Sequence, residues 1–275
     1  MKEYFRVQAK IDLDAIYHNL IETKKRLKPG TKLMAIIKAD GYGHGAVPIA
    51  WTVDSIVDAY GVAILEEAIE LRKAGVTKPI LILGYTPSML FEEVIENDIT
   101  QTVFNFDMAK QMSLQAVALE KQAKIHIKLD TGMSRIGFND SNETINIIKE
   151  INELPNISIT GMFTHFACAD MTDKTSAKHQ FERYVDFAER LERVGIKIPT
   201  KHVANSAAII DLPETHMNMV RSGISTYGLY PSEEVDKQNL SITPAMKLIT
   251  RVIFVKEVEP GTGIGYGSTF IAKHK

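Results

Sequence analysis

The chain has 275 residues, with 32 Lys and Arg against 34 Asp and Glu, a formal net charge of −2 and 45% hydrophobic residues. This balance lacks the basic excess of nucleic-acid-binding proteins, and no apolar run approaches the roughly 18 residues of a membrane-spanning helix. A single cysteine, Cys168, excludes an internal disulfide. The first residues lack the apolar core of a signal peptide, so we expect a cytoplasmic globular protein without nucleic-acid or membrane partners.

Short apolar runs alternate with amphipathic segments along most of the chain. A leading helix is expected at 12–27, where Asp12 or Asp14 can cap its start and Pro29–Gly30 follows its end. The expected strands are 32–39, 60–65, 79–83, 100–104, 124–129, 157–165, 200–204 and 217–221. The expected helices among them are 46–57, 66–74, 87–97, 107–122, 142–152, 176–194 and 206–212.

Eight strands that are joined by helices predict an α/β fold, a parallel (β/α)8 barrel of the TIM type. The strand runs are nearly continuously apolar, which is typical of strands covered on both faces. An open doubly wound sheet is the alternative, but eight near-regular repeats favour closure. We therefore assign residues 1–240 to the barrel.

The pattern of apolar runs and amphipathic segments ends near Pro231. A polar stretch leads to residues 246–255, which alternate in character, and a Pro-Gly turn follows at 260–261. Alternation beside such a turn predicts antiparallel β structure. Residues 241–275 are therefore expected to begin an all-β domain that the chain leaves incomplete.

The most informative segment is 36–45, Ile-Ile-Lys-Ala-Asp-Gly-Tyr-Gly-His-Gly. Lys38 stands where an apolar strand ends, and a lysine in such a place can form a Schiff base with an aldehyde. The glycines beside it let the backbone approach a ligand closely. A lone lysine at a strand end more often reaches solvent, and the turn also suggests dinucleotide binding. Its spacing, however, is not Gly-x-Gly-x-x-Gly.

Other polar residues stand near the C-terminal ends of the predicted strands, where (β/α)8 barrels carry their functional groups. They are Lys128, Arg135, His165, Asn205, Ser206 and Arg221. Each alone has an ordinary explanation, such as a core histidine, a surface ion pair or a helix cap. Together at one mouth of the barrel, they predict a functional site. No metal is expected, because His179, His202 and His216 show no ligand spacing with acidic residues.

The order Lys-Ala-Asp-Gly-Tyr-Gly-His-Gly at 38–45 closely resembles the pyridoxal-phosphate lysine motif of the alanine racemase family. The other similar segments are 128–137, Lys-Leu-Asp-Thr-Gly-Met-Ser-Arg-Ile-Gly; 161–166, Gly-Met-Phe-Thr-His-Phe; 205–206; 219–224; and 265–267. The resemblance covers nearly the whole chain. It implies a fold type III pyridoxal-phosphate enzyme that converts L-alanine to D-alanine for cell-wall peptidoglycan.

The resemblance also implies residue roles around the cofactor. Lys38 would bind pyridoxal phosphate covalently and then act as one of two proton-transferring bases. Tyr42 and Ser206 would contact the phosphate, with the backbone of Gly223 and Ile224. Asn205 belongs to the same cofactor-binding set.

Further roles implied by the resemblance concern catalysis. Arg221 would face the pyridine nitrogen, and His165 would lie between Arg221 and the second base, Tyr266. Arg135 would approach the phenolic oxygen of the cofactor and the substrate carboxylate. Lys128 resembles the lysine that is carbamylated in many family members. In the family the tyrosine comes from the partner subunit, which implies a homodimer with shared active sites.

Alternative functions remain open at the level of sequence. A serine racemase of the same family and a non-catalytic pyridoxal-phosphate-binding barrel both share the lysine, and an ornithine-type decarboxylase would need further acidic contacts. Residues 264–273 read as the opening of a β domain. We therefore expect a fragment of a longer racemase, with a poorly held tail beyond about Pro244 and little activity by itself.

Overall fold

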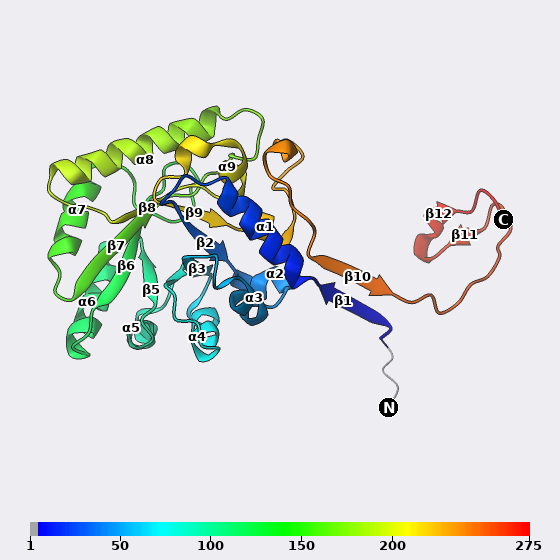
Figure 1. The fold of residues 1–275 in the computed structure, drawn as a ribbon, viewed down its shortest axis with the longest axis horizontal. Coiled ribbons are helices and arrows are strands. Elements are labelled where there is room, and N and C mark those ends of the chain that lie inside the picture. The colour runs from blue at the N-terminus through cyan, green and yellow to red at the C-terminus, as the bar shows by residue number, and fades with distance from the viewer. Residues whose placement is uncertain (1–4) are drawn as a thin grey trace. The chain divides into compact units, whose positions relative to one another are not determined.

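The computed structural model describes residues 5–275, and contacts within the chain divide them into two compact units (Figure 1). One unit is residues 11–245. The other combines residues 5–10 with residues 246–275.

The larger unit contains an eight-stranded parallel sheet in the order β8-β7-β6-β5-β4-β3-β2-β9. Its strands are β2 (Lys32–Ile36), β3 (Ala59–Val62), β4 (Ile80–Ile82), β5 (Thr100–Val103), β6 (Ala123–Lys128), β7 (Ile157–Phe163), β8 (Thr200–His202) and β9 (Met219–Ser222). Backbone bonds from Asn218 N to Lys201 O (3.2 Å) and from Arg221 N to Ala204 O (3.0 Å) link the segments of β8 and β9. The predicted barrel is confirmed.

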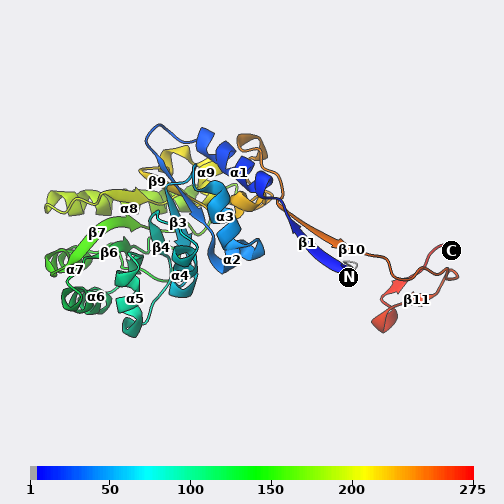
Figure 2. The same ribbon diagram turned by 60° about the horizontal axis from the view of Figure 1, so that its bottom comes forward.

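Helices lie around the outside of this sheet (Figure 2). They are α1 (Leu13–Lys25), α3 (Ala46–Val53), α4 (Leu65–Lys73), α5 (Phe91–Glu96), α6 (Phe106–Ala118), α7 (Asn142–Glu153), α8 (Thr175–Arg193) and α9 (Ser206–Asp211), with short 3-10 turns η1 (Ser88–Leu90), η2 (Pro213–Thr215), η3 (Ile224–Tyr227) and η4 (Lys237–Asn239). Asp12 caps α1 as predicted, because its carboxylate accepts from Ala15 N at 3.0 Å. Within residues 5–275, no helix is long and apolar enough to cross a bilayer.

The two faces of the barrel strands differ in character. In β6, Ile125 and Ile127 pack into the apolar core between sheet and helices, and the alternate residues Lys124, His126 and Lys128 face the barrel interior, since successive side chains of a strand point to opposite sides. A small separate apolar cluster also lies among the strands; it comprises Met34, Ile36, Ala59, Leu81, Phe163 and Met219. The expectation of nearly continuous apolar strands is therefore wrong for β6.

The smaller unit contains two short two-stranded sheets. One pairs β1 (Val7–Ile11) with β10 (Met246–Thr250), and the other pairs β11 (Gly263–Ile264) with β12 (Phe270–Ile271) in antiparallel fashion. The prediction of β structure throughout 246–255 is wrong beyond Thr250, because the residues that follow up to 262 form neither helix nor strand. The strand ends where its backbone partner ends, with Arg251 N donating to Arg6 O at 3.2 Å.

Candidate functional site

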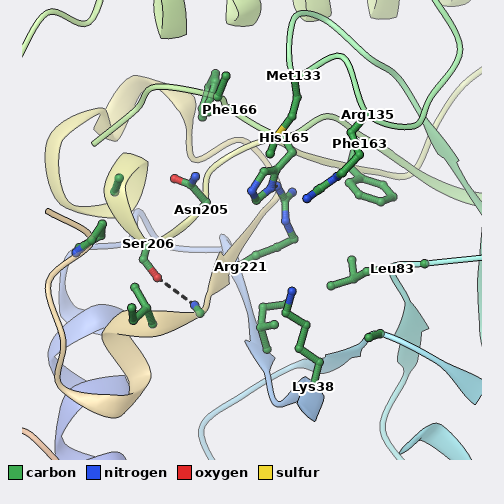
Figure 3. A pocket seen from close by; sticks show the side chains of 18 of the residues that line it. Lys38, Leu83, Met133, Arg135, Phe163, His165, Phe166, Asn205, Ser206 and Arg221 are labelled. Atoms are coloured by element: carbon green, nitrogen blue, oxygen red, sulfur yellow. Dashed lines mark hydrogen bonds between the residues drawn. The ribbon is translucent and has the colours of Figure 1, made fainter. Parts of the chain in front are cut away.

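A cavity of about 610 Å³ opens at the C-terminal ends of the barrel strands, and its lining comes entirely from residues 11–245. It brings together every predicted site residue of the barrel, namely Lys38, Tyr42, Lys128, Arg135, His165, Asn205, Ser206, Arg221, Gly223 and Ile224. Figure 3 shows Lys38, Arg135, His165 and Arg221 directed toward the same space. Tyr266 does not line this cavity; it lies in the smaller unit, in η5 (Tyr266–Ser268), with a fully exposed side chain.

Lys38 is the first residue of α2 (Lys38–Gly43), a short turn whose backbone is mostly in the left-handed region. The four residues after Lys38 have positive φ values of 52, 49, 59 and 53°, and only the third, Gly41, is a glycine. The left-handed region costs other residues roughly 1–2 kcal/mol each. This turn therefore needs support from the surrounding structure.

Two carboxylates provide that support. Glu67, in α4, accepts from Ala39 N at 2.6 Å and from Ala63 N at 2.7 Å. It thus ties the residue after Lys38 to the end of β3. Asp40 Oδ1 accepts from Ala46 N at 2.7 Å, at the start of α3. Hydrogen bonds from backbone N–H groups to carboxylates are among the stronger ones in proteins. They hold the turn from which the Lys38 side chain enters the cavity.

A third carboxylate orders the loop that carries Arg135. Asp130 follows β6, and its Oδ1 accepts from the backbone N–H groups of Gly132, Met133 and Ser134 at 2.9–3.0 Å. Its Oδ2 accepts from Arg135 N at 2.9 Å. Burial opposes ionisation of Asp130, but these donors outweigh it and lower the pKa of the carboxyl. The loop is therefore fixed where Arg135 reaches the cavity.

Hydroxyl and backbone groups form a small cradle on the opposite wall. Ser206 Oγ accepts from Gly223 N at 2.9 Å (Figure 3) and from Ser225 N at 3.3 Å. A Cβ at Gly223 would lie in ordinary van der Waals contact with the two hydroxyls, 3.6 Å from Ser206 Oγ and 3.7 Å from Tyr42 Oη, so the glycine leaves the space between them free. Asn205 caps α9 by accepting from Ala208 N at 3.1 Å. The cap holds Ser206 at this position.

Arg221 lies buried at the floor of the cavity. Its Nη1 donates to His202 Nδ1 (2.9 Å) and His202 O (2.9 Å), and its Nη2 donates to Thr164 O (2.8 Å), Val203 O (3.0 Å) and His165 Nδ1 (3.3 Å). The hydrogen bonds of the described residues do not involve its Nε, and none of their salt bridges pairs it with a carboxylate. Its charge is therefore held by carbonyls and neutral imidazoles, and Nε–H remains for a ligand.

The cavity is rich in positive charge. Lys38, Lys128, Arg135 and Arg221 line it, and Asp170 is the acidic residue among the described lining. Burial and then the Arg221 charge lower the pKa of Lys128 to about 7. Burial, followed by Arg221, also lowers the pKa of His165 to about 3, and burial lowers that of Arg221 to about 10. At neutral pH, His165 is uncharged, Arg221 is charged, and the site favours an anion.

Phe163 and His202 are parts of this site that the sequence analysis did not identify. The Phe163 ring stacks on His202, with centroids 4.8 Å apart and planes at 9°. Lys128 Nζ lies 5.5 Å from the centroid of the same ring, and Arg221 Cζ lies 5.3 Å from it. Cations at such distances are attracted to an aromatic face. The sequence signal for both residues was the alternation of side chains along β7 and β8, which places every second residue in the barrel interior.

Comparisons with known proteins identify the family. The sequence model described as "Alanine racemase, N-terminal domain" matches residues 11–231. The chain belongs to the alanine racemase family. An alanine racemase of Methanococcus maripaludis is 47% identical over 268 residues, which cover 97% of this chain and 72% of that protein. One of Clostridium perfringens is 48% identical over 270 residues, covering 98% and 70%.

The chain also has the fold of a solved member of this family. A solved alanine racemase of Clostridium difficile 630 superimposes with a TM-score of 0.92 at 44% identity, covering 99% of this chain and 72% of the other. The resemblance found in the sequence is therefore confirmed at the level of family and fold.

The buried histidines make stability depend on pH. Burial and then Arg221 lower the pKa of His126 to about 3, and burial lowers that of His202 well below its ordinary value. Unfolded histidine titrates near ~6.5, so the unfolded chain binds more protons below that pH. We predict that stability, fully present above about pH 6.5, falls by about 1.4 kcal/mol per pH unit for each histidine toward pH 3.

Urea unfolding at several pH values would measure this slope. His126→Leu should remove one histidine's share of the slope. A free energy of unfolding that is constant between about pH 7.5 and pH 5 contradicts the prediction.

Proposed function

We propose that this chain interconverts L- and D-alanine with pyridoxal phosphate bound through Lys38. The observation that carries the proposal is a strand-end lysine in a cationic cavity with a hydroxyl cradle, in a chain of the alanine racemase family. The relatives named alanine racemase, at 47–48% identity, favour alanine over serine as substrate. In this role a cytoplasmic homodimer would supply D-alanine for cell-wall peptidoglycan.

The described residues fit the cofactor. The cradle around Gly223 suits a phosphate, which Tyr42, Ser206 and the backbone of Gly223 and Ile224 would hold. The free Nε–H of Arg221 suits the pyridine nitrogen. When bound, pyridoxal phosphate supplies an electron sink that makes the Cα–H bond of the amino acid acidic.

Arg221 limits the strength of that sink. Burial lowers the pKa of its guanidinium only to about 10, so at neutral pH it stays charged, donates hydrogen bonds and does not transfer a proton. A pyridine nitrogen that accepted from Arg221 would stay unprotonated. The weaker electron sink would favour rapid return of a proton to Cα over side reactions. This behaviour suits a racemase better than a transaminase.

His165 carries the effect of Arg221 toward the second base. Its Nδ1 accepts from Arg221 Nη2, so in the neutral ring the proton is on Nε2. This N–H can donate to the phenolic oxygen of Tyr266 when that oxygen is negative. Because the His165 ring is uncharged at neutral pH, Arg221 carries the positive charge of this pair.

Racemisation needs one base on each face of the planar carbanion. Lys38 Nζ would serve one face, and Tyr266 Oη of the partner subunit would serve the other. Arg135, fixed by the Asp130 loop, would bind the substrate carboxylate and the phenolic oxygen of the cofactor. Lys38 and Tyr266 would thus move the proton, and Arg135 would hold the substrate between them.

Lys128 is proposed to be carbamylated. Its Nζ is buried, donates to Leu129 O at 2.6 Å and has a pKa of about 7, so a large fraction is unprotonated at neutral pH. The nitrogen lone pair attacks CO2, a C–N bond forms, and one proton leaves Nζ for solvent. The product carries a negative charge, which would compensate Arg135 and orient it.

The first test of this function concerns Lys38. Lys38→Ala should abolish the covalent attachment of pyridoxal phosphate and nearly all D/L-alanine interconversion, because the amine that binds the aldehyde is gone. Lys124→Ala, a lysine at the other end of the barrel, should keep both. The measurements are borohydride reduction with peptide mass analysis, and a racemisation assay. Attachment at another lysine contradicts the assignment, and attachment without interconversion would favour the non-catalytic cofactor-binding alternative.

A second prediction concerns the direction of proton transfer. Tyr266→Phe removes the base of one face only, so it should slow exchange of the α-proton from one enantiomer at least tenfold more than from the other. Solvent deuterium exchange measured separately from D- and L-alanine reports this ratio. Tyr17→Phe is the control at a partly exposed position. Equal losses for both enantiomers contradict a role on one face.

A third prediction concerns Lys128. Only the neutral amine reacts with CO2, so carbamylation should rise as pH increases through about 7. With 13C-labelled bicarbonate, the carbamate carbon should give an NMR signal that is absent in Lys128→Met. Lack of this signal near pH 8 would show that Lys128 acts as an unmodified amine.

A further inference from the structure

Arg221, His202 and His126 form a series of hydrogen bonds through the barrel interior. Arg221 Nη1 donates to His202 Nδ1 at 2.9 Å, and His202 Nε2 lies 3.0 Å from His126 Nδ1. Both residues are buried, with exposed fractions of 0% for His202 and 7% for His126. His126 comes from β6 and also lines a second cavity, of about 290 Å³, at the N-terminal ends of the strands. The three side chains thus connect the floor of the active-site cavity to the opposite end of the barrel.

The direction of each hydrogen bond follows from the chemistry of arginine. A guanidinium has donors and no acceptor, so His202 Nδ1 must be unprotonated to receive the Arg221 N–H. A neutral His202 then carries its proton on Nε2 and donates it to His126 Nδ1. His126 must in turn carry its proton on Nε2. The series therefore has one consistent arrangement of protons, with both imidazoles in the Nε2–H tautomer.

Packing leaves both rings little freedom. A Cβ at Gly161 would lie 2.5 Å from two atoms of the His126 ring, so this ring rests directly on the glycine backbone. His202 stacks on Phe163 with the planes at 9°. The arrangement of protons on the two imidazoles would change if residue 126 offered no acceptor to His202 Nε2–H. His202 could then move its proton to Nδ1, where it would face the Arg221 N–H and repel it.

We propose that His126 is a positioning residue of the reaction, which fixes the tautomer of His202 and thereby the place of the Arg221 guanidinium. The inference rests on the proposed function where it concerns the cofactor, because Arg221 is the group that would meet the pyridine nitrogen. His126 does not touch the active-site cavity and acts through His202. A position two residues before Lys128 on the inward face of β6 thus controls a group on β9.

The direct test is the tautomer of each ring in the wild-type chain. Long-range 1H–15N spectra of the [15N]histidine-labelled chain, assigned with His126→Asn and His202→Gln, distinguish Nδ1–H from Nε2–H. Both residues should be Nε2–H tautomers with or without added pyridoxal phosphate. An Nδ1–H tautomer or a charged ring at either position overturns the proposal. Because this measurement does not depend on the cofactor, it separates failure of the inference from failure of the proposed function.

Substitutions at 126 test the consequence. His126→Leu removes the acceptor and should change the His202 tautomer and weaken pyridoxal-phosphate binding about tenfold, the size expected when a buried hydrogen-bond partner is removed. His126→Asn keeps an oxygen acceptor near the place of Nδ1 and should restore most of the affinity. If His126→Leu fails to fold, the wild-type tautomers and the affinity of His126→Asn still decide the question.

His216→Leu is the matched control, since His216 is a buried histidine (1% exposed) that does not hydrogen-bond to Arg221, His202 or His126. It should change thermal stability but neither the His202 tautomer nor cofactor affinity. Equal loss of affinity in His126→Leu and His126→Asn, or in the His216 control, would show that any change in the core has this effect, and would overturn a specific positioning role.

Discussion

The buried guanidinium of Arg221 is the constraint around which the site is organised. A charge removed from water is unfavourable unless polar groups replace the lost hydration, and here carbonyl oxygens and two imidazole nitrogens do so in place of a carboxylate. The strand ends of a parallel barrel offer these carbonyls, since the ladder stops there. The cost of burial remains visible in the lowered pKa of the guanidinium. Burial first, and then the charge of Arg221, lower the pKa values of His126, His165 and His202, so all three imidazoles resist protonation.

Asp170 is the acidic residue in the described lining of the cavity, and three further carboxylates beside the cavity have another role. Asp40, Glu67 and Asp130 all accept hydrogen bonds from backbone N–H groups, and these bonds fix the Lys38 turn and the Arg135 loop. Their charge therefore serves to order the chain, and the cavity itself stays cationic. Such a cavity is suited to a ligand that carries its own negative charge, as a phosphate ester or an amino-acid carboxylate does.

Sequence patterns were sufficient for the barrel and for most of the site. Eight apolar runs between amphipathic segments predicted all eight strands, and polar residues near strand ends predicted which side chains would meet. The left-handed turn after Lys38 was not predictable, because Ala39, Asp40 and Tyr42 have no intrinsic preference for it and distant Glu67 helps to hold it. Pairing of β1 with β10 was missed for the related reason that nothing local specifies a partner some 240 residues away.

The interior histidines were missed because the strands were read as uniformly apolar. In β6 the polar residues Lys124, His126 and Lys128 alternate with isoleucine, and this period of two was present in the sequence. The period shows which side chains face inward, but it does not show that His126 meets His202 on another strand. That contact depends on the register of β6, β7 and β8.

Phe163 is a shared neighbour of two cationic residues of the site. Lys128 Nζ and Arg221 Cζ lie 5.5 and 5.3 Å from the centroid of its ring, so two like charges share one aromatic neighbour. After burial, the charge of Arg221 is the largest cause of the lowered pKa of Lys128. If Arg221 were replaced by a neutral residue, the Lys128 amine would therefore hold its proton to higher pH and react less with CO2. Under the proposed function, an Arg221 variant would lose its own contact with the cofactor and would also reduce the carbamylation of Lys128, so two effects on activity would be expected from one substitution.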